Sequence, residues 1–113
     1  MKTANTYQDI LFNAKRPIIK VLLETDFTKE LRIVMQRGTI MKEHKTSYPI
    51  VIEILEGDIN FELKDETKHL VKGALIALDG NVVHGLKANK NTIIRLTLTK
   101  KDTATRVEKI TSK

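Results

Sequence analysis

Two histidines, His44 and His84, are the side chains in this sequence best suited to chemistry. They stand forty positions apart, each coupled to a run of β-forming residues. An imidazole titrates near neutral pH and can bind a metal, transfer a proton or hydrogen-bond a ligand. If a closed β-structure brings the two histidines together, the functional site lies where they meet.

Few other groups in the sequence are arranged for catalysis. The chain of 113 residues has no cysteine, which excludes disulfides, thiolate metal sites and cysteine nucleophiles. It also lacks a G-x-S-x-G motif, a phosphate-binding glycine loop and suitably spaced carboxylate pairs. Tyr48 lies near His44 and is expected at the rim of the site. His69 follows a charged turn and is expected at the surface.

The elements that must position the histidines are short runs of β-branched and aliphatic residues. Turn signals such as Asp79-Gly80-Asn81 separate these runs. The central part of the chain has no long amphipathic helix, which excludes βαβ units there. The pattern predicts about eight strands, at residues 18–24, 30–36, 50–55, 59–63, 67–71, 74–78, 82–86 and 92–99, with a short extended piece at 39–41 that leads to His44.

This spacing predicts one all-β domain over residues 1–113, with its core at about 17–99. Tyr7, Ile10 and Leu11 have roughly helical spacing, so the N-terminal segment is either a short helix or a docking arm. The C-terminal tail from residue 101 is polar, with a short helix expected at residues 104–110.

The formal net charge is +6, from 20 basic and 14 acidic residues. The basic residues are scattered singly or in pairs and aromatic residues are scarce, which argues against nucleic-acid binding and favours a solvated surface. No stretch is apolar enough for a signal peptide or a membrane span, so we expect a cytoplasmic protein without membrane contact.

The two histidine segments resemble the two sequence motifs of the cupins, small barrels built as a double-stranded β-helix. In the first motif, Gly38, His44 and Gly57 stand at the family spacing. In the second motif, Gly73 and His84 do so. At the other motif positions the sequence departs from the family, with Thr46 for a histidine, Ile50 for the glutamate, Asp79 for a proline, Asn81 for a glycine and Ala88 for an asparagine.

The resemblance covers residues 30–99 and implies a jelly-roll barrel with its site inside. In cupins the four ligand positions hold one divalent metal ion, and here they correspond to His44, Thr46, Ile50 and His84. Two of the four usual donors are therefore missing. A first-row metal needs three or more protein donors to compete with its own hydration. We therefore expect no tightly bound cofactor, with zinc, nickel, manganese or iron at His44 and His84 as the alternative.

The leading hypothesis is a cupin barrel that binds a small molecule in an apolar cup. The alternatives are a metal-dependent isomerase or oxygenase, whose ligand set is completed from outside the motif, and a binder of nucleic acid or another acidic partner through the charge of +6. Glu53, flanked by Val51 and Leu55, indicates a homodimer interface in which Arg32 or Arg95 pairs with Glu53. The residues expected to line the cup are His44, His84, Thr46, Tyr48, Ile50, Ile52, Phe61 and Met35.

Overall fold

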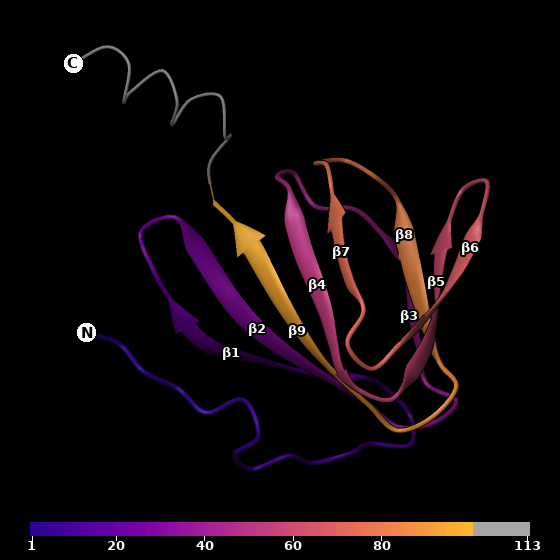
Figure 1. Ribbon diagram of the computed structural model, residues 1–113, viewed down its shortest axis with the longest axis horizontal. Coiled ribbons are helices and arrows are strands. Elements are labelled where there is room, and N and C mark those ends of the chain that lie inside the picture. The colour runs from indigo at the N-terminus through magenta and orange to yellow at the C-terminus, as the bar shows by residue number, and fades with distance from the viewer. Residues whose placement is uncertain (101–113) are drawn as a thin grey trace.

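The computed structural model describes residues 1–100, which fold into two antiparallel β-sheets without a helix. One sheet has the strand order β1-β2-β9-β4-β7 and the other β3-β8-β5-β6. Figure 1 shows the first sheet from left to right, followed by the second. The all-β prediction is therefore confirmed. The strands are β1 (Ile18–Glu24), β2 (Thr28–Met35), β3 (Ile40–His44), β4 (Ile50–Glu56), β5 (Asp58–Leu63), β6 (Thr67–Val71), β7 (Leu75–Leu78), β8 (His84–Ala88) and β9 (Thr92–Thr99).

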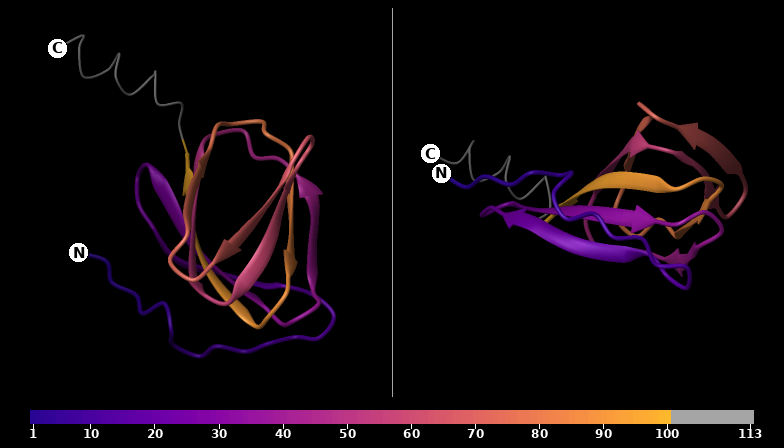
Figure 2. Two further views of the ribbon diagram at one scale, coloured as in Figure 1. Left: turned by 45° about the vertical axis from the view of Figure 1, so that its right-hand side comes forward. Right: turned by 90° about the horizontal axis from the view of Figure 1, so that it is seen from below.

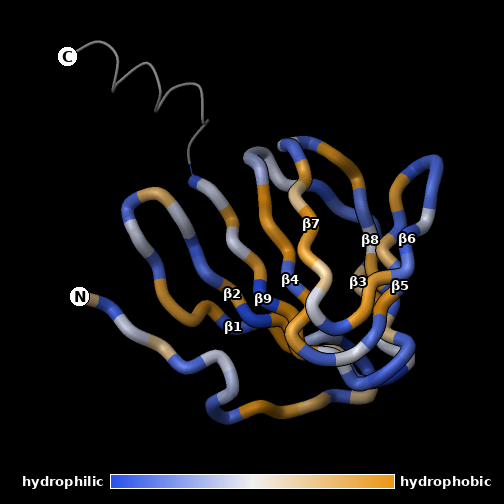
Figure 3. Tube along the Cα trace, viewed as in Figure 1, coloured by the Kyte–Doolittle hydropathy of each residue, from blue (hydrophilic) through white to orange (hydrophobic). Residues whose placement is uncertain are grey.

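The core lies between the two sheets, which face each other in the left view of Figure 2. The core side chains come from alternate residues of the strands. In β4, Ile50, Ile52 and Ile54 are buried, while Val51 and Glu53 between them are exposed. The apolar run along β4 is visible in Figure 3. Burying each such side chain stabilises the fold by about 1.5–3 kcal/mol. The buried core comprises Ile33, Met35, Ile50, Ile52, Ile54, Ile59, Phe61, Leu78, Leu86, Ala88 and Ile94.

One predicted strand was placed too early in the chain. The run at residues 82–86 was expected to be extended throughout, but β8 begins only at His84. The preceding Asn81 has a left-handed backbone with φ of 66°. The backbone carbonyl of Val82 accepts a hydrogen bond from the His84 ring and does not join the sheet ladder. Val82 and Val83 therefore belong to the loop before β8.

The N-terminal segment is an arm and not a helix (Figure 1). Arg32 of β2 fixes it in place by donating hydrogen bonds to the backbone carbonyls of Thr6 at 2.8 Å, Gln8 at 2.6 Å and Asp9 at 3.4 Å. Only 2% of Arg32 is exposed. The arm thus satisfies the two terminal nitrogens of a buried guanidinium, whose Nε has no hydrogen-bond partner among the described residues. The expected helix at residues 104–110 lies outside the described part of the chain.

The two arginines expected to pair with Glu53 at a dimer interface both bind other groups within the chain. Within the chain Arg95 pairs with Glu30, at 2.7 Å, and Arg32 binds the N-terminal arm. Val51 and Glu53 of β4 remain exposed. The homodimer itself stays a prediction. Among the described residues no helix is long and apolar enough to cross a membrane.

The chain passes from one sheet to the other at Gly57, between β4 and β5. Gly57 has φ of 103°, in the left-handed region that disfavours residues with a Cβ. A Cβ added there would lie 2.3 Å from the Thr92 hydroxyl oxygen and 2.6 Å from the Asn91 carbonyl oxygen. Gly57 lies too close to Asn91 and Thr92, at the start of β9, for any side chain at this position.

Replacing Gly57 tests this close approach. We expect Gly57→Ala to lower the free energy of unfolding by about 3 kcal/mol, from left-handed strain together with overpacking. The matched control Gly73→Ala has a similar φ of 92° but an open Cβ position, so we expect a loss of about 1–2 kcal/mol. Urea unfolding followed by circular dichroism measures both. Equal losses would contradict the close contact at Gly57.

Candidate functional site

The two histidines meet on neighbouring strands. His44 ends β3 and His84 begins β8, and the two are direct partners in the antiparallel pairing of these strands. Their ring centroids lie 4.4 Å apart at an interplanar angle of 57°. Residues paired in this way point to the same face of a sheet. The pairing therefore brings together two side chains that are forty positions apart in sequence.

A β-bulge in β3 makes this meeting possible. Met41 pairs with Leu86 and His44 with His84, so β3 has one residue more than β8 between the two pairs. In a regular strand Met41 and His44 would point to opposite faces, since they are three positions apart. The extra residue turns both toward the interior. Gly85 leaves room for the bulge, because a Cβ there would lie 3.2 Å from the Met41 carbonyl oxygen.

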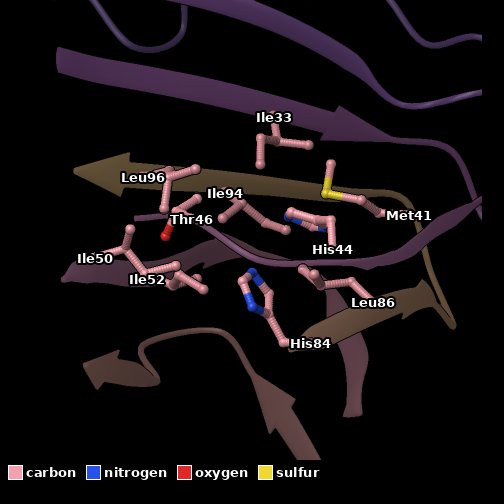
Figure 4. A pocket seen from close by; sticks show the side chains of 10 residues that line it. All are labelled: Ile33, Met41, His44, Thr46, Ile50, Ile52, His84, Leu86, Ile94 and Leu96. Atoms are coloured by element: carbon pink, nitrogen blue, oxygen red, sulfur yellow. The ribbon is translucent and has the colours of Figure 1, made fainter. Parts of the chain in front are cut away.

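The histidines line a small apolar cavity between the sheets (Figure 4). Its volume is about 20 Å³. A cavity needs at least about 10–15 Å³ to hold one water molecule, so this one has room for a single water or a monatomic ion. No carboxylate or ammonium group contributes to the lining, which consists of Ile33, Met41, His44, Thr46, Ile50, Ile52, His84, Leu86, Ile94 and Leu96.

Backbone hydrogen bonds fix both rings in the same way. Nδ1 of His44 lies 2.8 Å from the Lys42 carbonyl oxygen, and Nδ1 of His84 lies 2.9 Å from the Val82 carbonyl oxygen. Since a carbonyl only accepts, each Nδ1 carries the proton and donates it. In the neutral rings the lone pair then sits on Nε2. Neither Nε2 has a hydrogen-bond partner among the described residues, and in Figure 4 the two rings face each other across the cavity.

His84 is the inner member of the pair and His44 the outer one. Only 3% of His84 is exposed, whereas His44 lies at the surface. Phe61 stacks on the His84 ring, with centroids 5.6 Å apart and an interplanar angle of 19°. Burial lowers the pKa of His84, the hydrogen bond to the Val82 carbonyl opposes this, and the nearby His44 lowers the pKa further. His84 is therefore neutral at pH 7 and acts as a hydrogen-bond acceptor.

Five of the eight residues expected in the cup line the cavity, namely His44, His84, Thr46, Ile50 and Ile52. The other three do not. Met35 and Phe61 are fully buried in the core around the cavity, and Phe61 touches it only through the His84 ring. Tyr48 is 39% exposed and outside the lining. Its backbone carbonyl accepts a hydrogen bond of 3.1 Å from the Thr46 hydroxyl.

The residues expected in the cup did not include five members of the lining: Ile33, Met41, Leu86, Ile94 and Leu96. Ile33 and Leu86 could have been found from alternation, because they share a strand face with Met35 and His84 respectively. Met41 gave no such signal. Strict alternation places Met41 and His44 on opposite faces of the strand. The bulge that brings both to the same face has no clear signal in the sequence.

His69 lies at the surface, as expected, with 60% of its side chain exposed. Its Nε2 lies 2.6 Å from an Asp58 carboxylate oxygen. The side-chain amide of Asn89 donates to the same oxygen at 2.9 Å. These two contacts outweigh partial burial and lower the pKa of Asp58, with the Asn89 hydrogen bond as the largest cause. This cluster joins the β5–β6 hairpin to the loop between β8 and β9, and none of its residues lines the cavity.

The residues at the cavity do not fit a tightly bound divalent metal ion. Among residues 1–100 no group of three or more His, Cys, Asp or Glu side chains could hold a metal. The four positions that hold metal in the family do converge on the cavity, but they supply only two imidazole nitrogens. Ile50 offers no donor, and the Thr46 hydroxyl already donates to the chain.

Solved structures identify the architecture. An RmlC-like cupin from Desulfovibrio desulfuricans superposes with a TM-score of 0.80 at 20% identity, covering 88% of this chain and 96% of that one. The chain has the cupin fold. A conserved Klebsiella pneumoniae protein with a double-stranded β-helix domain gives a TM-score of 0.76 at 16% identity, covering 88% and 89%.

A conserved Streptococcus pyogenes protein of unknown function also superposes on this chain. It gives a TM-score of 0.75 at 17% identity and covers 88% of each chain. No family model matches the sequence, and none of the curated proteins matches it. At such low sequence identity the structural similarity establishes the double-stranded β-helix fold but not the function.

The lowered pKa of His84 predicts a loss of stability at mildly acidic pH. The unfolded chain takes up a proton near pH 6.5 more readily than the folded protein, so the free energy of unfolding falls as the pH drops below 6.5. Urea unfolding across this range measures the effect. In the His84→Leu variant the slope should disappear. The pKa values of Glu24, Glu30 and Asp58 are also lowered in the folded protein, from ordinary values of 4.5, 4.5 and 3.8. These carboxyl groups therefore affect stability at a lower pH than His84 does. An equal slope in the variant would contradict the assignment to His84.

Proposed function

We propose that this protein binds a small molecule at the His44–His84 cavity, through a group of the ligand that donates hydrogen bonds. The observation that carries the proposal is the pair of Nε2 atoms, both without a partner among the described residues, at an apolar cavity. Each Nε2 lone pair can accept a hydrogen bond, so a ligand that donates to both nitrogens gains free energy that an apolar ligand does not.

The polarity of the site selects the kind of ligand group. Both imidazoles offer lone pairs, and the Thr46 hydroxyl uses its proton on the Tyr48 carbonyl and also offers lone pairs. A hydroxyl or ammonium group can donate to these acceptors. A carboxylate cannot donate, and no cationic side chain lines the cavity to attract it. The proposed ligand is therefore a small alcohol or amine, and not an acid.

The size of the cavity limits how much of the ligand enters. A volume of about 20 Å³ admits one polar head group in place of a water molecule. The rest of the ligand lies beyond the exposed His44, on the outer side of the pair. A neutral or cationic head group of the ligand can bind between the two imidazole acceptors without a metal ion. This agrees with a cavity that offers only two imidazole nitrogens as metal ligands. A divalent metal enzyme, the alternative, would need a donor set that residues 1–100 do not supply.

Matched ligand pairs test this proposal. In a thermal-shift series of alcohols, primary amines and carboxylates on the same carbon skeleton, we expect the first two to stabilise the protein and the carboxylates to have no effect. Ligand at 100 times its Kd should add about 2.7 kcal/mol to the free energy of unfolding. The His44→Gln variant should lose most of this effect, and the surface control His69→Gln should keep it. Stabilisation by carboxylates, or an unchanged response in His44→Gln, would contradict the proposal.

A further inference from the structure

Two loops meet at the end of the barrel that holds the histidine cavity. One loop joins β3 to β4 and spans residues 45–49, and the other joins β7 to β8 and spans residues 79–83. Figure 1 shows both at the upper end of the barrel. Thr46 of the first loop is part of the cavity lining (Figure 4). The position of this loop therefore determines how large a group the cavity of about 20 Å³ admits.

Few contacts hold the two loops together. The backbone N–H of Asn81 donates to the Thr46 carbonyl oxygen at 2.7 Å, and this is the one backbone hydrogen bond between the two loops in the described part of the chain. Beside it, Gly80 lies so close to Ser47 that an added Cβ would be 2.4 Å from the Ser47 carbonyl oxygen. A single backbone hydrogen bond contributes little net free energy, because water replaces it when it breaks. The junction can therefore open without unfolding the barrel.

The first loop is fixed at both ends and exposed between them. At one end His44 pairs with His84 across β3 and β8. At the other end the Pro49 carbonyl oxygen accepts hydrogen bonds from the Thr99 hydroxyl at 2.7 Å and from the Thr99 backbone N–H at 3.3 Å. Three of the four residues in the segment 45–48 are exposed. Only this short segment is free to move away from the cavity.

The second loop is held to the barrel. The Val82 side chain packs against the core, and the Val82 carbonyl accepts the hydrogen bond from the His84 ring. Movement of this loop would break both contacts. The segment 45–48 has an internal hydrogen bond instead, from the Thr46 hydroxyl to the Tyr48 carbonyl at 3.1 Å, which is kept when the segment moves as one unit. The first loop is therefore the one that opens.

We propose that residues 45–48 form a lid over the cavity, which the hydrogen bond from Asn81 to Thr46 holds closed. The inference rests on the proposed function only in taking the cavity as the ligand site. With the lid closed, only 3% of His84 is exposed, and opening gives a ligand access to its Nε2. Gly80 and Asn81 therefore control access to the site, although neither residue lines the cavity.

Replacing Gly80 with alanine should push the lid open. Gly80 does not have the positive φ that would strain an alanine, so the added methyl group acts through its overlap with the Ser47 backbone. Diethyl pyrocarbonate acylates neutral imidazole nitrogens and is too large to enter the closed cavity, so its reaction with His84 measures opening. We expect Gly80→Ala to raise the rate at His84 by roughly 3–10-fold, the effect of losing one backbone hydrogen bond. The rate at the exposed His69 should not change.

The matched control is Ser47→Ala, which shortens a side chain but keeps the backbone carbonyl that Gly80 meets. It should leave the reactivity of His84 unchanged. The three histidines lie on different tryptic peptides, so mass spectrometry at low extents of reaction measures each rate separately. An unchanged rate at His84 in Gly80→Ala, or an equal rise in Ser47→Ala, would overturn the proposal.

Hydrogen exchange in the unmodified protein supplies a readout that depends on no variant. The Asn81 amide is bonded across the lid junction, whereas the Ala88 amide is bonded to the Thr39 carbonyl at 3.0 Å within the barrel. We expect the Asn81 amide to be protected but to exchange faster than the Ala88 amide, because local opening needs less free energy than unfolding. Exchange as slow as that of Ala88 would mean that the lid opens only when the barrel unfolds. Exchange without protection would mean that the lid is not held closed, and either result would overturn the proposal.

These readouts also distinguish the lid from the proposed function. If His84 becomes more reactive in Gly80→Ala but no alcohol or amine binds, the lid stands and the organic-ligand site is wrong. If alcohols and amines bind in a His44-dependent manner but the reactivity of His84 does not respond to Gly80→Ala, the lid is wrong and the organic-ligand site stands. If neither result is obtained, both proposals fall.

Discussion

The histidine site of this protein depends on one extra residue in β3. The bulge between Met41 and His44 changes which face His44 occupies, and with it the composition of the cavity. Without the bulge, strict alternation would turn either Met41 or His44 away from the interior. The fold tolerates this irregularity because β3 is an edge strand and because Gly85, on the paired strand, presents no Cβ toward it.

The surroundings of the histidine pair explain its chemistry. Ile50, where the family has a carboxylate, makes the cavity more apolar and leaves it without an anion. Burial then favours the neutral form of His84, and the backbone carbonyls of Lys42 and Val82 set the tautomer of both rings. The result is an apolar site whose lining contains no carboxylate or ammonium group. The proposed ligand, a group that donates hydrogen bonds, matches the two imidazole acceptors of this site.

Much of the fold follows from the sequence, because alternation and turn residues act locally. The isoleucines of β4 identify their own buried face, and the spacing of glycines and histidines is enough to indicate the cupin motifs. Sequence reasoning also found His44, His84, Ile50 and Ile52 at the cavity. It placed Met35 and Phe61 there too, because alternation shows which residues of a strand face inward but not which of them reach the cavity. Met41 escaped because a bulge is a property of two paired strands, and no single run of residues reveals it.

The tautomeric state of the two histidines, measured by long-range ¹H–¹⁵N correlation spectra of the ligand-free protein at pH 7.5, is the most direct test of a site built from converging lone pairs. We expect His44 and His84 both to carry their proton on Nδ1 and to show unprotonated Nε2 signals, and ligand binding to perturb only the Nε2 shifts. A proton on Nε2 of either ring would contradict this, since that nitrogen would then be a donor and the site would lack its converging lone pairs.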